Sequence, residues 1–404
     1  MQGVRKMYNF DEIINRQHTN SMNTDGFREY IFHDDGTKTF PYKDEEFIRM
    51  WIADMEFATP DVVIEGIKER LEDRIFGYTR VFNPEYYEAF SGWCKRRYGW
   101  EFPKKHLVMS NGVIPALFEL VEHICEEGEE VLFFTPSYAY FKYAADNCGR
   151  GIVVSDLDLV NGRFEIDFED FEEKASRSTT KLLILCNPHN PTGRIWTTEE
   201  LQKIGDIALK HDLWIISDEI HCDLLRTGRN HTPLAKLFPD EAKLITAMAP
   251  SKTFNMAGLM ISNIIIPDDE LRAKWLKTHY NFDNPLSIAA AQAAYEKGEP
   301  WLRELCTYLD DNFSFTREYL SKHLPKAWMA DSESTYLAWV DVSHYLKDEE
   351  SLPLFFAYQA GVLLEGGNMF VDNSDGYIRL NLACPRSVLE EGLKRICNAI
   401  NSKA

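Results

Sequence analysis

A lysine and an aspartate, each placed directly after an apolar run, are the residues of this chain best suited to chemistry. Lys252 comes soon after the run 244–248, and Asp218 follows the run 213–217. A lysine amine can form a Schiff base with an aldehyde, and a buried carboxylate can hold a protonated ring nitrogen. Because the carboxyl ends of strands in open α/β sheets bind ligands, we expect the two side chains to share one site. The pair predicts a cofactor that carries an aldehyde on a pyridine ring.

Other candidate ligand contacts also stand at predicted strand ends. Gly112 and Val113 lie between an apolar run and a helical pattern, where free amide groups can bind a phosphate. Tyr138 can lie flat on a heteroaromatic ring, and Asn190, in a run with two Asn-Pro steps, can donate its amide to a phenolate oxygen. Each segment also has a structural interpretation: a strand–glycine–helix turn, a half-buried tyrosine and a proline-fixed turn.

The charged candidates leave structural alternatives open as well. Asp218 also suits a helix N-cap, and His221 suits either a cofactor contact or a structural role. A lone lysine is usually solvated, but the apolar run before Lys252 favours burial. Arg379 alternates with apolar neighbours in a strand-like run, where an arginine is often a carboxylate fork and sometimes only an edge-strand charge.

Short apolar runs alternate with helical patterns from about residue 105 to 267. This pattern predicts an α/β fold with a mainly parallel, seven-stranded sheet that helices cover on both faces. The predicted strands are His106–Ser110, Glu130–Phe134, Gly151–Val154, Lys181–Cys186, Leu213–Ser217, Leu244–Met248 and Met260–Ile266. We expect an N-terminal arm that joins the small domain at 1–50, a large cofactor-binding domain at 51–284 and a small α+β domain at 285–404.

The composition of the 404-residue chain is that of a globular enzyme. Its formal net charge of -20 argues against nucleic acid and anionic membranes as partners. The apolar runs are too short to span a membrane, and the polar residues 1–16 give no signal-peptide pattern. The cysteines form no CxxC pair, which argues against a metal site or disulfides and favours free thiols in a reducing cytoplasm.

Taken together and in this order, the segments resemble the fold-type I enzymes that depend on pyridoxal 5′-phosphate (PLP), the aspartate aminotransferase superfamily. The resemblance rests on the glycine loop, the tyrosine, Asn190-Pro191-Thr192-Gly193, the aspartate, Ser251-Lys252 and the late arginine. It implies that Lys252 holds PLP as a Schiff base and that Asp218 pairs with the pyridine nitrogen. It places Asn190 on the ring oxygen, Tyr138 against the ring, and His221 where a tyrosine is often found.

The same resemblance implies the remaining contacts. Gly112, Val113 and Ser251 match phosphate-binding positions, and Arg379 matches the residue that binds the α-carboxylate of the substrate. Tyr78, in Phe76-Gly77-Tyr78-Thr79, resembles the tyrosine that reaches the phosphate of the neighbouring subunit. We therefore expect a homodimer that acts on a small amino acid, with Lys252, Asp218 and Tyr78 taking part in catalysis.

A narrower resemblance is to the MalY/PatB branch of cystathionine β-lyases, or C–S lyases. The segments that carry it are Tyr8–Glu12, Trp51–Pro60, Ser110–Pro115, Ser217–His221, Ala249–Leu259 and Ser262–Ile265. Many aminotransferases have a phosphate-binding arginine eight residues after the lysine, where this chain has Met260. The departure suits the lyase branch and leaves the full set of phosphate contacts open.

This branch implies a C–S β-lyase that cleaves L-cystathionine or a related cysteine S-conjugate. The α,β-elimination would release a thiol, pyruvate and ammonia. Lyases and aminotransferases share every step up to the carbanion, so an aminotransferase is the first alternative. A regulatory binding role on the same scaffold is the second, because some relatives combine it with catalysis.

Overall fold

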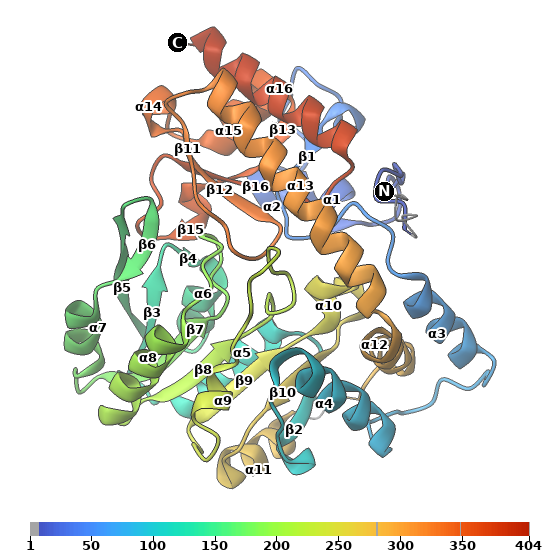
Figure 1. Cartoon of the computed structure of the whole chain (residues 1–404), viewed down its shortest axis with the longest axis vertical. Coiled ribbons are helices and arrows are strands. Elements are labelled where there is room, and N and C mark those ends of the chain that lie inside the picture. Colours follow the sequence, from blue (N-terminus) through green and yellow to red (C-terminus); the bar gives the residue numbers. More distant parts are fainter. Residues whose placement is uncertain (1–7, 280–281, 348, 404) are drawn as a thin grey trace.

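An eight-stranded sheet forms the centre of the chain. In the computed structural model, which describes residues 8–279, 282–347 and 349–403, the strand order is β2-β10-β9-β8-β7-β3-β5-β6 (Figure 1). The strands are β2 Leu107–Ser110, β3 Glu130–Thr135, β5 Gly151–Val160, β6 Arg163–Ile166, β7 Thr180–Cys186, β8 Trp214–Asp218, β9 Leu244–Met248 and β10 Ser262–Ile265. Each predicted strand is present, so the predicted α/β fold is confirmed, but the sheet has eight strands and not the predicted seven.

The sheet is mixed, with a parallel centre. Strands β5, β3, β7, β8 and β9 pair in parallel, whereas β10 is antiparallel to both β9 and β2. The strand outside the predicted set is β6, which returns antiparallel to β5 through Asn161 and Gly162, both with positive φ angles. An Asn-Gly step between two strand-like runs is a strong hairpin signal, so the sequence did contain a sign of this strand.

Helices cover both faces of this sheet because residues along the inner strands alternate between two apolar cores. On one face, Val131 and Phe133 share a core with α5, α6 and α11. On the other face, Leu132 and Phe134 share a core with α7, α8 and α9. The helices are α5 Val113–Ile124, α6 Ala139–Asn147, α7 Phe168–Ala175, α8 Thr198–Lys210, α9 Leu234–Leu237 and α11 Asp269–Thr278. A strand buried on both faces has to be apolar throughout, which explains the continuous apolar runs.

A second, four-stranded antiparallel sheet lies above the first in Figure 1, with α15 and α16 at the top. Its order is β11 Trp328–Met329, β12 Leu337–Asp341, β16 Tyr377–Asn381 and β14 Glu365–Gly366, and its helices are α15 Leu352–Ala360 and α16 Arg386–Lys403. The N-terminal segment joins this unit through β1 (Ile48–Arg49), which pairs in parallel with β13 (Val362–Leu363). The domain limits 1–50, 51–284 and 285–404 stay a prediction.

Long helices connect the two sheets. Helix α12 (Pro285–Lys297) packs against α3 (Asp61–Leu71) and α4 (Pro84–Tyr98). Helix α13 (Glu299–His323) contributes its first half to the same core and its second half to the core of the four-stranded unit. Further short elements are α1 Met22–Asp25, α2 Phe27–Phe32, α10 Pro250–Thr253, α14 Ser343–Leu346, β4 Ser137–Tyr138 and β15 Phe370–Val371.

No helix in the described part of the chain is long and apolar enough to cross a membrane. The cysteines at positions 94, 125, 148, 186, 222, 306, 384 and 397 are free thiols. Within residues 8–279, 282–347 and 349–403, no group of three or more His, Cys, Asp or Glu side chains could hold a metal ion.

Candidate active site

A cavity of about 320 Å³ lies at the carboxyl ends of the parallel strands and also receives residues from the four-stranded sheet. Of the residues predicted for the site, all but Tyr78 line it: Gly112, Val113, Tyr138, Asn190, Asp218, His221, Ser251, Lys252 and Arg379. The topology explains why they meet. Strands β3, β7, β8 and β9 run in one direction, so the residues that follow them gather at one edge of the sheet.

Lys252 lies in α10, which begins shortly after β9 ends. Its Nζ donates a hydrogen bond to the carbonyl oxygen of Ala53 at 2.7 Å. Burial lowers the pKa of the amine, and the carboxylate of Asp54 opposes that shift. Lowering the pKa of a lysine increases the fraction of neutral amine, which is the form that attacks a carbonyl carbon.

Asp218 ends β8, and its side chain is almost fully buried. Its Oδ1 accepts a hydrogen bond from the backbone amide of Ile220 at 3.2 Å. Burial raises the pKa of this carboxyl group to about 7, against the lowering effect of the Ile220 bond. A protonated ring nitrogen placed against Asp218 would supply the cation that keeps the carboxylate ionised. The residue therefore fits a pyridine cofactor.

His221 is buried beside the same cavity. Burial lowers the pKa of its imidazole to about 3, so the ring is neutral. Its Nδ1 is buried without a hydrogen-bond partner among the described residues. Leaving a buried polar nitrogen unpaired is costly, and a polar substituent on a bound cofactor would remove that cost.

The N-terminus of α5 suits a phosphate group. Val113 and Ile114 lie in its first turn, where backbone N–H groups have no partner inside a helix. A Cβ atom on Gly112 would lie only 3.2 Å from Cδ of Pro115, so the lack of a side chain suits this tight turn. Ser251 faces the same cavity from α10. Met260, where many aminotransferases have arginine, also lines the cavity and brings no charge.

Tyr138 and Asn190 occupy the side of the cavity next to Arg379. The ring of Tyr138 stacks on that of Tyr140, with centroids 5.1 Å apart. Asn190 is buried and accepts a hydrogen bond at its Oδ1 from Nη1 of Arg379 at 3.2 Å. Arg379 Nη2 donates to the carbonyl oxygen of Trp51 at 3.3 Å and forms an ion pair with Glu365.

Tyr78 lies outside this cavity. Its side chain is 89% exposed, and its ring stacks on Phe282 at a centroid distance of 4.6 Å. Nearby in the chain, Ile75, Phe76 and Phe82 are also exposed. Within a single chain Tyr78 therefore does not line the cavity, and its predicted role across a subunit boundary stays a prediction.

Several cavity residues were absent from the predicted set. Glu365 pairs with Arg379, Tyr30 lines the cavity from α2, and Ala53 accepts hydrogen bonds from both Lys252 and Tyr336. Sequence signals for these residues are weak because they belong to segments far from the strand ends. Glu365 does directly follow the buried apolar run Val362–Leu364, and a charge in that position is a sign of a paired, buried side chain.

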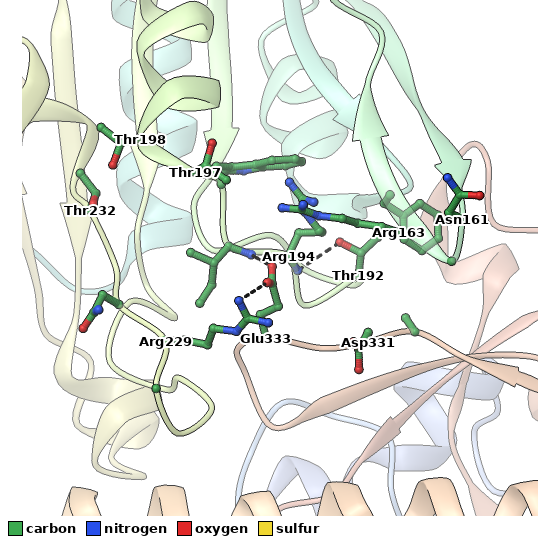
Figure 2. Close-up of a pocket in the computed structure, with 17 residues that line it drawn as sticks. Asn161, Arg163, Thr192, Arg194, Thr197, Thr198, Arg229, Thr232, Asp331 and Glu333 are labelled. Carbon is green, nitrogen blue, oxygen red and sulfur yellow. Dashed lines mark hydrogen bonds and ion pairs between the residues drawn. The ribbon is translucent and has the colours of Figure 1, made fainter.

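A larger cavity of about 550 Å³ is lined by Thr192 and Arg194, which follow Asn190 in the chain (Figure 2). Arg194 lines it, but its Nη2 already donates to both carboxylate oxygens of Glu200, at 2.7 and 2.8 Å. Glu333 accepts from the amide of Ile195 and forms an ion pair with Arg229 at 3.2 Å, as the dashed lines in Figure 2 show. None of the predicted site residues lines this cavity, and its charged groups mainly join neighbouring segments.

The fold and the smaller cavity together define a class of proteins. A helix-covered α/β sheet with a buried lysine and aspartate at its carboxyl edge is the arrangement of the aminotransferase-like PLP enzymes. Residues 45–396 match the family described as aminotransferase class I and II, and the chain belongs to that family.

Three relatives make the similarity more specific. The chain is 40% identical to the cystathionine β-lyase PatB of Bacillus subtilis (strain 168), with 87% of this chain and 92% of that protein covered. It is 30% identical to the protein MalY of Escherichia coli (strain K12), with 98% and 100% covered. The crystal structure of a PLP-bound C–S lyase from Staphylococcus hominis with the inhibitor L-cycloserine matches with a TM-score of 0.94, 50% identity, and coverage of 97% of this chain and 98% of that one.

Proposed function

We propose that this protein is a PLP-dependent C–S β-lyase. It cleaves L-cystathionine or a related cysteine S-conjugate by α,β-elimination and releases a thiol, pyruvate and ammonia. The observation that carries the proposal is that Lys252, Asp218 and Arg379 line one cavity at the carboxyl edge of the sheet. The identity to proteins named cystathionine β-lyase and C–S lyase supports the choice of reaction.

Bound in this cavity, PLP would supply an acceptor for the electrons that remain when the Cα proton of the substrate departs. Lys252 removes that proton, and the lowered pKa of its amine favours the neutral base that the step requires. Asp218 keeps the ring nitrogen protonated, and Asn190 donates its side-chain amide to the ring oxygen. His221 stays neutral and offers Nδ1 as a hydrogen-bonding group.

Arg379 binds the α-carboxylate of the substrate and so determines which bond at Cα is aligned for cleavage. Arg379 as a whole residue is 1% exposed, and this burial strengthens an ion pair by excluding water. The Asn190 side chain and the Trp51 carbonyl oxygen fix its orientation. A planar fork held in this way can bind a carboxylate through two parallel hydrogen bonds.

An aminotransferase remains the second candidate, because the family includes that activity and the residues that would form the carbanion are shared. The two activities differ in what they require and release. A lyase releases thiol and pyruvate from L-cystathionine without a keto acid, whereas an aminotransferase turns over only when a keto acid accepts the amino group. Incubating the purified protein with L-cystathionine alone and measuring both products tests the proposal. Product formation that depends strictly on an added keto acid would overturn it.

The proposed working unit is a homodimer. The exposed apolar side chains of Ile75, Phe76, Tyr78 and Phe82 would be buried by a second subunit, and burial of such a patch favours association. Tyr78 would then reach the phosphate bound by the partner.

The free cysteines support a reducing compartment, and we propose the cytoplasm as the location.

A further inference from the structure

The carboxylate of Glu365 lies against the guanidinium that is proposed to bind the substrate. Glu365 in β14 stands directly opposite Arg379 in β16, and their side chains form an ion pair. Both residues line the cavity that holds Lys252 and Asp218. The side chains of Glu365 and Arg379 are 8% and 2% exposed, so little water screens the pair. The substrate carboxylate would thus meet a guanidinium whose charge is already neutralised.

Two acceptors besides Glu365 also hold the guanidinium in place. Asn190 Oδ1 accepts from Nη1 of Arg379 at 3.2 Å, and the Trp51 carbonyl oxygen accepts from Nη2 at 3.3 Å. Both acceptors are neutral. Nε of Arg379 is buried without a partner among the residues that the structure describes, so the fork retains a donor for an incoming ligand. If Glu365 served only to orient Arg379, it would repeat what the Asn190 and Trp51 contacts already do.

We propose that Glu365 is an internal competitor for the substrate carboxylate: a ligand carboxylate displaces it from Arg379, and Glu365 takes up one proton from solvent as it is displaced. The inference rests on the proposed role of Arg379. A second unpaired carboxylate in a buried cavity is unfavourable, because two negative charges would then share one guanidinium. Protonation of Glu365 removes that repulsion. Ligands that lack a carboxylate leave the ion pair intact and bind without proton uptake.

The groups around Glu365 favour this exchange. Arg379 is the main cation that acts on it, Lys252 adds to this effect while its amine is free and protonated, and the neutral phenols of Tyr30 and Tyr138 face it from α2 and β4. Burial raises the pKa of Glu365 above its ordinary value even though Arg379 opposes the shift. Loss of the Arg379 contact raises the pKa further. Above the pKa of the free site, ligand binding therefore requires proton uptake, and the affinity falls as pH rises.

The test uses the PLP-loaded protein and 3-(methylthio)propionate, a desamino substrate analogue that can occupy the carboxylate site without reacting. Calorimetric titration in two buffers of different ionisation enthalpy measures both the affinity and the number of protons taken up. We expect wild type to take up protons, approaching one per ligand at the higher pH, and to bind more weakly at about pH 8 than at about pH 6. Glu365→Gln should bind about tenfold or more tightly at about pH 8, with no proton uptake.

Matched controls separate this inference from the function on which it rests. The neutral analogue 3-(methylthio)propanol should bind without proton uptake, and Glu333→Gln, which alters an arginine-paired carboxylate outside this cavity, should behave like wild type. If wild type binds the carboxylate with no proton uptake, or Glu365→Gln binds no more tightly, the inference is overturned while the role of Arg379 stands. If Arg379→Ala leaves the affinity for the carboxylate unchanged, the role of Arg379 itself fails. The absence of proton uptake in wild type would overturn the inference even if the variant does not fold.

Discussion

The amine of Lys252 lies 2.7 Å from the carbonyl oxygen of Ala53, a residue 199 positions earlier in the chain. The hydroxyl of Tyr336 donates to the same oxygen at 2.8 Å. Ala53 lies in the loop that follows β1. This loop therefore contacts both Lys252, which follows β9, and Tyr336, which directly precedes β12 of the four-stranded sheet. This contact holds the amine inside the cavity, beside Asp218 and Arg379.

We expect PLP to be linked covalently to Lys252, because this amine is buried in the cavity and its pKa is lowered. The purified protein should absorb at about 420 nm. Borohydride reduction should attach the cofactor irreversibly to the peptide that contains Lys252. Peptide mass spectrometry checks the position. Label on another lysine would rule out the assignment, and Lys252→Ala should show neither the absorbance nor the label.

Asp218→Asn should retain the fold and lose turnover by about 10²-fold or more, because the neutral amide cannot keep a ring nitrogen protonated. The loss of PLP should be modest, since the phosphate contacts are unchanged. Steady-state kinetics and the cofactor content of the same preparation measure the two effects separately. Turnover close to that of wild type would remove Asp218 from this role.

The contribution of Asp218 to the stability of the cofactor-free protein should fall as pH rises from about 4 to about 7. Burial raises the pKa of Asp218 to about 7 in the folded state, so the folded protein binds a proton that the unfolded chain has already lost. Ionising the buried carboxyl group should cost up to about 4 kcal/mol of unfolding free energy. Denaturant unfolding of cofactor-free wild type and Asp218→Asn across this range isolates the contribution. Equal pH dependence in the two proteins would contradict it.

Mixing Lys252→Ala with Tyr78→Phe should restore activity if Tyr78 acts on the neighbouring subunit. A hybrid dimer then contains one site with both native residues. The experiment requires that Tyr78→Phe is strongly impaired alone and that subunits exchange, which sedimentation of the mixture can follow. A protein that is monomeric and fully active would exclude the arrangement.

Arg379→Ala should lower kcat/KM by an amount equivalent to about 2–4 kcal/mol while PLP stays bound, because the substrate carboxylate loses its buried guanidinium partner. Arg379→Lys should recover only part of the activity, since an ammonium cannot form two parallel hydrogen bonds. A cysteamine conjugate, which lacks the carboxylate, serves as the control substrate: wild type should process it poorly and the mutation should add little. Equal impairment on both substrates, or release of PLP, would indicate a structural role.

The sequence by itself determined the sheet and the residues at its carboxyl edge. Buried parallel strands must be apolar throughout, so 213–217 and 244–248 could be recognised from composition alone. Because parallel strands end at the same edge, the positions of Asp218 and Lys252 after those runs were enough to predict that they meet. The local apolar pattern and the parallel topology both place these two side chains at one edge of the sheet. Their meeting could therefore be predicted without knowing any long-range contact.

Only the tertiary structure decided what surrounds these residues. Ala53 and Glu365 come from a loop and a two-residue strand, and nothing in their neighbouring residues specifies where the chain will pack. Glu365 meets Arg379 because β14 pairs with β16 in one register, and a shift by one residue would turn the side chain to the opposite face. Strand pairing between distant segments therefore decides whether an internal carboxylate neutralises the arginine proposed to bind the substrate. The order of residues along the chain does not reveal this pairing.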